Sequence, residues 1–308
     1  MKIGLASAIA GIPTVKSLNS YGGIERVVSG LSKAFQDMGH ETIVAGYKGT
    51  DCGDENIVLD NEQELLNNPF DCDVLFDFSH YKNGIANKKF SIPMYTDVIG
   101  INPIFPSYAV KHAVGNIGGK VIYMGIDLPP LRKVQKTNDF CFVGRISRIK
   151  GMDLISYLIK NADLKIKIAG HVDKFDEDFA YKFIDMAKEY GCEVKTDVQY
   201  DGIIDTLAES KYFIFSPSWH ILFGSSAVES FGIAAVEALS QNTTVLTSMQ
   251  QSGVIEIIRN RGYILDGLNE WKDFIRNPKK PLEDLYLYAD YFSSKAYAAR
   301  LYEQLLNI

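Results

Sequence analysis

Short apolar runs alternate along this chain with longer segments in which apolar residues recur every three or four positions. The short runs are typical of buried strands, and the longer period is typical of amphipathic helices. In the clearest case a strand at 3–6 precedes a helix over 24–39, in which Val27 and Leu31 share one face and Gly39 marks the end. Strands that alternate with helices in this way predict a parallel sheet with crossover helices.

The pattern predicts two series of such units. The first has strands at 3–6, 41–46, 73–78 and 93–96, and helices at 24–39 and near 62–67. The second has strands at 140–143, 165–169, 193–196, 212–215 and 244–247, and helices at 152–160, 175–190, 203–208 and 233–239. Residues 101–120 contain Pro and Gly at short intervals and give no clear element.

The charge-rich segment 132–139 lies between the two series and is typical of a linker. We therefore expect two doubly wound, Rossmann-like α/β domains, residues 1–128 and residues 129–288. An amphipathic helix within 289–308 is expected to pack back on the first domain.

The composition is that of an ordinary globular protein, since 46% of the 308 residues are hydrophobic and 23% are charged. A formal net charge of −6 gives no general attraction to nucleic acid or to anionic membranes. The four cysteines are scattered, which argues against a disulfide framework and fits a reducing compartment. The apolar run after Lys2 is too short for a signal peptide, and no segment approaches the length of a transmembrane helix. We expect a cytoplasmic protein with no nucleic-acid partner and at most peripheral membrane contact.

Two glutamates eight positions apart, Glu229 and Glu237, enclose a Phe-Gly step and a run of good helix formers. Glu229 is expected on the loop that enters a helix, and Glu237 about a turn and a half inside it. The free N–H groups and the positive dipole end near Phe231 and Gly232 suit a phosphate. A carboxylate further along can accept hydrogen bonds from paired hydroxyls, such as those of a ribose. The segment predicts a nucleotide-sugar clamp, although two surface glutamates on an amphipathic helix would have the same spacing.

The segment from Gly144 to Gly151 follows a buried strand and opens a helix. Open α/β sheets bind their ligands at this carboxyl end of the strands. Arg145, with its planar guanidinium, and Lys150, as a point charge, could neutralise a pyrophosphate. Taken alone, the segment would also fit a solvated basic loop.

A third segment, residues 21–26, lies between the first strand and the first helix. Gly22 and Gly23 let the backbone approach a ligand at the start of that helix. The segment lacks the Gly-x-Gly-x-x-Gly pattern of dinucleotide-binding proteins, which argues against a dehydrogenase.

These three segments resemble motifs of the retaining GT-B glycosyltransferases of family 4, and they occur in the same order. Glu229 and Glu237 match the Glu-x(7)-Glu element of that family. Arg145 and Lys150 match its Gly-Arg-x(4)-Lys-Gly motif position for position. The Gly-Gly step at 22–23 is similar to its Gly-Gly-x-Glu/Ala-Arg element. Weaker similarities cover most of the chain and are denser from about 120 to 258.

The resemblance implies an α/β chain with the GT-B fold, in which two Rossmann-like domains face each other across a cleft. The first domain would be the acceptor side and the second would bind the nucleotide sugar. In this reading Arg145 and Lys150 hold the donor diphosphate, Glu229 orients the sugar, and Glu237 binds the ribose. The resemblance places further donor contacts at Gly22, Gly23, Gly144, Gly170, Phe231 and Gly232.

The implied reaction moves a hexose, with retention of configuration, from a nucleoside diphosphate sugar to a hydroxyl of a saccharide, lipid-linked or protein acceptor. No cofactor and no metal are expected, and a UDP-sugar is expected as donor before a GDP-sugar. Asp71 and Asp73 form an Asp-x-Asp pair, but they precede a strand, and the family usually holds the diphosphate without metal. The alternatives are a GT-B nucleotide-sugar epimerase and a weakly catalytic nucleotide-sugar-binding protein.

The sequence departs from the family pattern at two places. The family usually has a His in a Thr-x-His-Gly context near the donor sugar, where this chain has Asp97, with His80 as a nearby alternative. We therefore count Asp97 and His80 among the candidate catalytic residues. The segment 219–226 before Glu229 is longer than usual and is expected to reshape the donor pocket.

Overall fold

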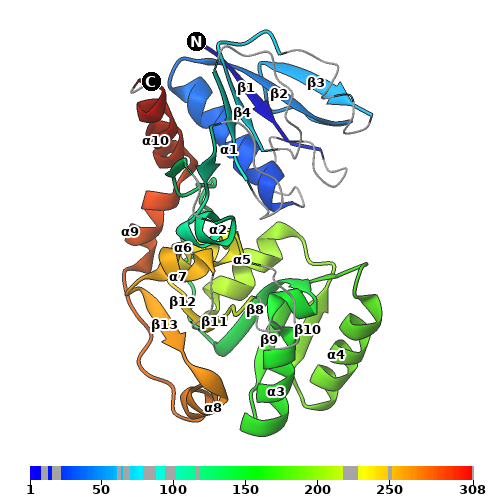
Figure 1. Cartoon of the computed structure of the whole chain (residues 1–308). Coiled ribbons are helices and arrows are strands. Elements are labelled where there is room, and N and C mark those ends of the chain that lie inside the picture. Colours follow the sequence, from blue (N-terminus) through cyan, green and yellow to red (C-terminus); the bar gives the residue numbers. More distant parts are fainter. Residues whose placement is uncertain are drawn as a thin grey trace. The chain divides into compact units, whose positions relative to one another are not determined.

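The computed structural model describes residues 1–7, 13–15, 22–60, 64, 70–78, 88–93, 102–115, 118–217, 228–248 and 252–306. The chain divides into two compact units (Figure 1): unit 1 contains residues 1–128 and 290–308, and unit 2 contains residues 129–289. Each unit is built around its own parallel sheet. None of the helices in the described part of the chain is long and apolar enough to cross a membrane.

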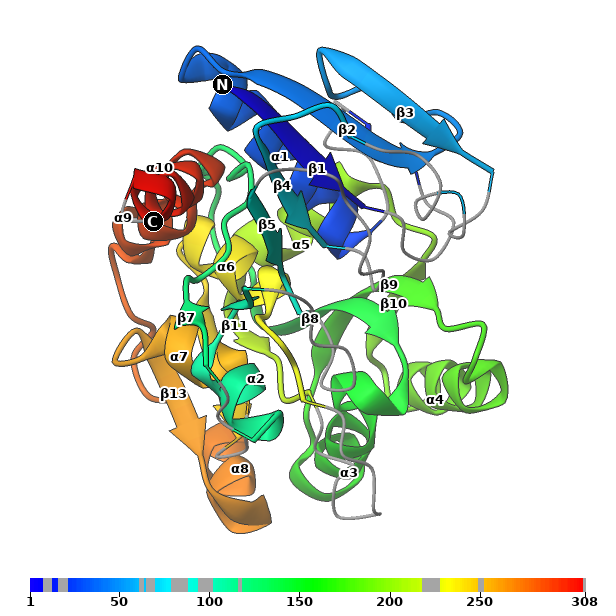
Figure 2. The same ribbon diagram turned by 45° about the horizontal axis from the view of Figure 1, so that its top comes forward.

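Unit 1 contains a five-stranded parallel sheet in the order β3-β2-β1-β4-β5, and Figure 2 shows these strands side by side. The strands are β1 (Lys2–Ala6), β2 (Glu41–Tyr47), β3 (Glu55–Leu59), β4 (Val74–Asp77) and β5 (Lys88–Ser91). The register pairs Ile3 of β1 with Thr42 on one side and with Val74 on the other. Because β1 lies inside the sheet, its apolar side chains are buried, as the continuous apolar run predicts.

Helix α1 (Gly23–Asp37) covers one face of this sheet and buries Val27, Leu31 and Phe35 completely. The spacing of these residues puts them on one helical face. A smaller pair of strands, β6 (Ile104–Phe105) and β7 (Lys120–Val121), and helix α2 (Tyr108–Ala113) complete the first 128 residues.

Helix α10 (Ser294–Leu306) packs against α1 in unit 1 (Figure 1). It follows the short helix α9 (Leu285–Ala289) and a 3-10 turn over Asp290–Phe292. Tyr297 and Leu301 of α10 are fully buried. The ring of Tyr302 stacks on His40 with the ring centroids 5.0 Å apart. Residues 290–306 therefore contribute to the core of unit 1.

Unit 2 contains a six-stranded parallel sheet in the order β10-β9-β8-β11-β12-β13. The strands are β8 (Asn138–Ile146), β9 (Ile166–Val172), β10 (Glu193–Thr196), β11 (Ser210–Ile214), β12 (Thr244–Ser248) and β13 (Gly262–Leu265). The helices are α3 (Met152–Ala162), α4 (Glu177–Glu189), α5 (Tyr200–Ala208), α6 (Ile233–Ser240), α7 (Gly253–Ile258) and α8 (Gly267–Arg276). Helix α3 packs beside α4 and α8, whereas α5 packs beside α6, so helices cover both faces of the sheet.

Residues 132–137 form no helix or strand, but they are held by unit 2. The backbone N–H of Arg132 donates to Gln241 Oε1 at 3.0 Å, and its guanidinium lies 2.8 Å from Asp201 Oδ1. Lys136 Nζ donates to Thr243 Oγ1 at 2.9 Å and to the Ser210 backbone oxygen at 2.7 Å. Burial lowers the pKa of Lys136 to about 8. The charge-rich segment is therefore a fixed part of unit 2 rather than a free linker.

The α/β class and the parallel sheets predicted from the sequence are confirmed, and β10 has the predicted bounds. The pattern did not predict β3, β13 or the helices α2, α7, α8 and α9. The predicted strand at 93–96 is wrong at Pro93, which follows β5 and has no N–H for a sheet hydrogen bond. Residues 94–96, and almost all of the helix predicted near 62–67, lie outside the described residues.

Candidate active site

The parallel sheet of unit 2 has a topological switch point between β8 and β11, where the order of the strands in the sheet reverses. From β8 the chain proceeds to β9 and β10 on one side, and then returns to β11 on the other. Open α/β sheets bind ligands beyond the carboxyl ends of the strands at such a point. Arg145 lies at the end of β8, Lys150 lies in the turn that follows β8, and the segment between β11 and α6 contains Glu229. The topology therefore brings two of the three predicted segments to one edge.

The segment from Gly144, near the end of β8, to Gly151, just before α3, is shaped by the glycines at its two ends. Gly144 has φ 134° and Gly151 has φ 88°, values that side chains other than glycine rarely adopt. A Cβ at Gly151 would also overlap the backbone oxygen of Ser216, which follows β11. Between the glycines, residues Arg148–Lys150 form a 3-10 turn that leads into α3. The glycines therefore let this loop lie directly against the end of β11.

Lys150 and Glu229 form an ion pair across this edge. Lys150 Nζ lies 2.5 Å from Glu229 Oε2, and the two side chains are 22% and 15% exposed. Lys150 Nζ also lies 5.8 Å from the centroid of the Phe215 ring. The backbone of Glu229 is fixed, since its oxygen accepts a hydrogen bond from Gly253 N–H at 2.9 Å. Two residues predicted separately from different motifs are thus in direct contact.

Helix α6 begins directly after the Phe-Gly step. Gly232 is the residue before the helix and adopts a left-handed conformation with φ 101°. A Cβ there would press against Val254 of α7. Glu237 lies inside α6 and is only 3% exposed, so it is not a surface glutamate. The Tyr200 hydroxyl donates to Glu237 Oε1 at 3.0 Å. The placement of Glu229 before the helix and Glu237 inside it is as the spacing predicted.

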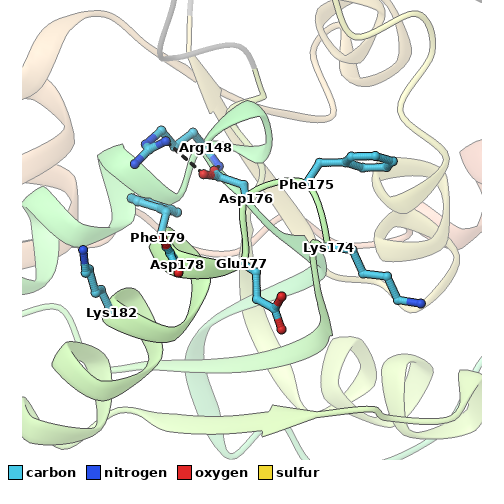
Figure 3. A pocket seen from close by; sticks show the side chains of 8 residues that line it. All are labelled: Arg148, Lys174, Phe175, Asp176, Glu177, Asp178, Phe179 and Lys182. Atoms are coloured by element: carbon cyan, nitrogen blue, oxygen red, sulfur yellow. Dashed lines mark hydrogen bonds and ion pairs between the residues drawn. The ribbon is translucent and has the colours of Figure 1, made fainter.

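The basic side chains at the end of β8 and in the turn that follows it have different surroundings. Arg145 Nη1 lies 3.6 Å from Asp173 Oδ2, and Asp173 is buried at the end of β9. Arg148 lies 2.9 Å from Asp176 Oδ1, and its guanidinium stacks 4.4 Å from the Phe179 ring centroid. Figure 3 shows Arg148, Asp176 and Phe179 together on the wall of a cavity of about 540 Å³. Arg148 therefore lines this cavity, whereas Lys150 contacts Glu229.

Gly144 and Gly170 face each other in the sheet. They are register partners in β8 and β9, and a Cβ at Gly170 would overlap the Gly144 carbonyl oxygen. The glycine at 170 is therefore required for close strand approach beside the Arg145 loop. The next strand is tied to the same point, because Asp197 N–H donates to the Gly170 oxygen at 2.9 Å.

Comparison with known protein families identifies the family to which this chain belongs. A family model described as "Glycosyl transferases group 1" matches residues 126–297, which is more than half of the chain. The chain belongs to this family. No curated protein matches the chain significantly.

Solved structures similar to this group 1 glycosyl transferase agree in fold over the whole chain. AviGT4, a glycosyltransferase involved in avilamycin A biosynthesis, is 21% identical with a TM-score of 0.78, and the match covers 99% of this chain and 96% of that chain. HepE from Anabaena, solved with UDP-glucose, is 15% identical with a TM-score of 0.72, covering 100% of both chains. Sucrose-phosphate synthase from Thermosynechococcus elongatus is 14% identical with a TM-score of 0.71, covering 99% of both chains. The expected GT-B fold is confirmed, and at these identities the likeness concerns the fold alone.

Unit 1 of the group 1 glycosyl transferase contains the Gly-Gly step at the start of α1. Gly22 has φ 123° and directly precedes the helix. The Glu25 carboxylate lies directly against Gly22, so that a Cβ at position 22 would overlap Glu25 Oε2. Glu25 is 3% exposed, and burial raises its pKa to about 7, partly offset by a hydrogen bond from its own backbone N–H. The donor contacts predicted for Gly22 and Gly23 stay predictions.

Several predicted features of the family site lie outside the described residues. These are Asp97, His80 and the segment 219–226. Asp71 and Asp73 are exposed, and Asp73 accepts a hydrogen bond from the backbone N–H of Lys2 at 2.9 Å. Within the described part of the chain, no group of three or more His, Cys, Asp or Glu side chains could hold a metal ion.

Sequence reasoning also missed residues of this edge. Tyr200, Asp173 and Gly253 each contact a predicted residue from a distant part of the chain.

Proposed function

We propose that this protein is a retaining, metal-independent glycosyltransferase that moves a hexose from a nucleoside diphosphate sugar to an acceptor hydroxyl. A UDP-sugar is the first candidate donor and a GDP-sugar the second. The acceptor is a saccharide, lipid-linked or protein hydroxyl, and the reaction takes place in the cytoplasm. The single observation that supports this most is the Lys150–Glu229 pair at the point between β8 and β11 where the topology favours ligand binding.

In this proposal the donor diphosphate is held by charge and by backbone. Arg145 and Lys150 neutralise it, and the N–H groups near Phe231 and Gly232 at the start of α6 contribute hydrogen bonds. Lys150 is only 22% exposed, so its charge acts in a partly desolvated place where it has more effect than in water. As the sugar–phosphate bond breaks, negative charge grows on the leaving diphosphate, and these groups stabilise it.

Glu229 and Glu237 would take different parts of the donor. Glu229 lies beside Lys150. Since Lys150 is proposed to bind the diphosphate, we propose that the Glu229 carboxylate binds the adjacent sugar. Glu237 is deeper in α6 and would accept hydrogen bonds from the ribose hydroxyls. Because the leaving phosphate can itself take the acceptor proton, the reaction needs no dedicated general base. Catalysis then consists mainly of positioning and charge stabilisation.

The test is a panel of UDP-, GDP- and ADP-sugars incubated with wild-type protein, Lys150→Met and the control Lys160→Met. Lys160 is exposed on α3, so its variant should keep wild-type activity. We expect slow donor hydrolysis by the wild type, transfer when a hydroxyl acceptor is present, and a loss of about a hundredfold or more in Lys150→Met. Proton NMR of the product gives the anomeric configuration, and inversion would contradict the retaining mechanism.

Other outcomes of the panel would replace the proposal. Formation of an epimeric sugar nucleotide would indicate a nucleotide-sugar epimerase. Tight binding without any turnover would indicate a nucleotide-sugar-binding protein. Full activity in Lys150→Met would contradict the proposal that the Lys150–Glu229 pair belongs to the active site.

A further inference from the structure

Tyr200 contacts Glu237, the predicted ribose ligand of the donor site. It is the first residue of α5, directly after the loop that follows β10, and it is half-buried. Its hydroxyl donates to Glu237 Oε1 at 3.0 Å, a contact between residues 37 positions apart in the sequence. The sequence motifs give Tyr200 no role.

The contact restricts the orientation of the Glu237 carboxylate. A glutamate with three rotatable side-chain bonds loses conformational freedom when it must hold one orientation. A carboxylate buried to this degree also needs hydrogen bonds to offset its lost hydration. The Tyr200 hydroxyl supplies one from a rigid aromatic side chain on a different helix.

The backbone before Tyr200 is tied to the diphosphate side of the site. Asp197 N–H donates to the Gly170 oxygen at 2.9 Å, and Gly170 is the register partner of Gly144, next to Arg145. Asp197 has φ 56°, so the chain turns sharply at this residue before it enters α5. A continuous series of contacts therefore runs from the Arg145 loop to Glu237.

We propose that Tyr200 is a positioning residue for the ribose, which holds Glu237 in the orientation that recognises the paired hydroxyls of a ribonucleoside diphosphate. The inference rests on the proposed function, because it takes Glu237 as the ribose ligand. In addition to the proposed function, the inference states that discrimination between a ribose and a 2′,3′-dideoxyribose depends on the Tyr200 hydroxyl. This hydroxyl does not itself need to contact the nucleotide.

The test compares Tyr200→Phe with wild type in binding to UDP and to 2′,3′-dideoxy-UDP by calorimetry. GDP and its dideoxy form take their place if the wild type binds GDP more tightly. The variant keeps the ring and removes only the hydroxyl. Tyr181→Phe is the matched control, since Tyr181 is exposed on α4. Circular dichroism establishes that all three proteins are folded alike.

The wild type should bind the dideoxy nucleotide about a hundredfold more weakly than UDP, since two hydrogen bonds to a carboxylate are lost. In Tyr200→Phe, UDP binding should weaken about tenfold while binding of the dideoxy nucleotide changes little, so the penalty shrinks to about tenfold. In turnover, KM for the donor should rise and kcat should stay near wild type, because the ribose is remote from the reacting bond.

One result would overturn the inference alone: a dideoxy penalty that is unchanged in Tyr200→Phe. This holds whether both affinities stay at the wild-type level or both fall by the same factor, which is the effect of general damage to the structure. A wild-type protein that binds none of the nucleotides would instead refute the proposed function, and the inference with it.

Discussion

Replacing Glu25 with Gln should stabilise unit 1 at alkaline pH and have little effect at pH 5. Glu25 is 3% exposed, and burial raises its pKa from 4.5 to about 7. Between these two values the folded chain holds a proton on Glu25 that the unfolded chain has lost. Stability therefore falls as the pH rises through this range, at about 1.4 kcal/mol per pH unit. Gln has nearly the same shape and no charge, so the variant should not show this loss.

The size of the effect follows from the range of pH. Between pH 5 and pH 8, the stability of Glu25→Gln relative to wild type should rise by about 2 to 3 kcal/mol. For a unit of this size, that corresponds to a difference of about 5 °C or more in the melting temperature. Part of the change falls below pH 5, because the unfolded carboxyl already titrates there.

Calorimetry can assign the effect to unit 1. Both tryptophans of the chain, Trp219 and Trp271, lie within residues 129–289, so intrinsic fluorescence follows the unfolding of unit 2. A calorimetric transition without a matching change in fluorescence then belongs to unit 1. Glu189→Gln is the control, because Glu189 is exposed on α4. An advantage of Glu25→Gln that is the same at pH 5 and pH 8, within about 0.5 kcal/mol, would refute the assignment of a buried, proton-binding carboxyl.

Three further predictions concern the donor site. Gly170→Ala should destabilise unit 2 by about 1 to 3 kcal/mol, because its methyl group would overlap the Gly144 oxygen, whereas Gly118→Ala, with open space around it, should be close to neutral in thermal unfolding. Glu237→Ala should weaken UDP binding about tenfold or more, as measured by calorimetry. Glu229→Ala should bind UDP within about twofold of wild type but lose activity in a transfer assay. The reverse pattern would mean that the two glutamates have each other's proposed role. Activity should persist in EDTA, and complete inactivation that Mn²⁺ restores would contradict the metal-independent site.

Those features of the site that depend on neighbouring residues could be predicted from the sequence. The start of α6, the position of Glu229 before it and that of Glu237 within it follow from the Phe-Gly step and the helix formers behind it. The loop after β8 was predictable for the same reason, because an apolar run, a glycine and a basic segment follow one another directly. The contact between Lys150 and Glu229 required the sheet order, which the family resemblance implied and the residues alone did not.

The features that could not be predicted depend on contacts between distant segments. Asp173, which contacts Arg145, follows β9, and Tyr200, which contacts Glu237, begins α5 after the neighbouring strand β10. Neither residue has a sequence signal of its own. The edge strand β3 was missed because its apolar run, residues 57–59, is only three residues long, and only Leu59 of the five strand residues is buried. Strand β5 was not predicted, because its four residues include Lys88 and Lys89 and therefore give no apolar run.

The packing of α10 against α1 has a consequence for the order in which the chain can fold during synthesis. Residues 129–289 are continuous, so unit 2 can form as soon as they have left the ribosome. Unit 1 is the first to be made, but Tyr297 and Leu301, which fill its core, are translated after all of unit 2. Until they arrive, the surface of α1 that they cover stays open to water and to other chains. The half of the protein that is synthesised first is therefore the half that is completed last.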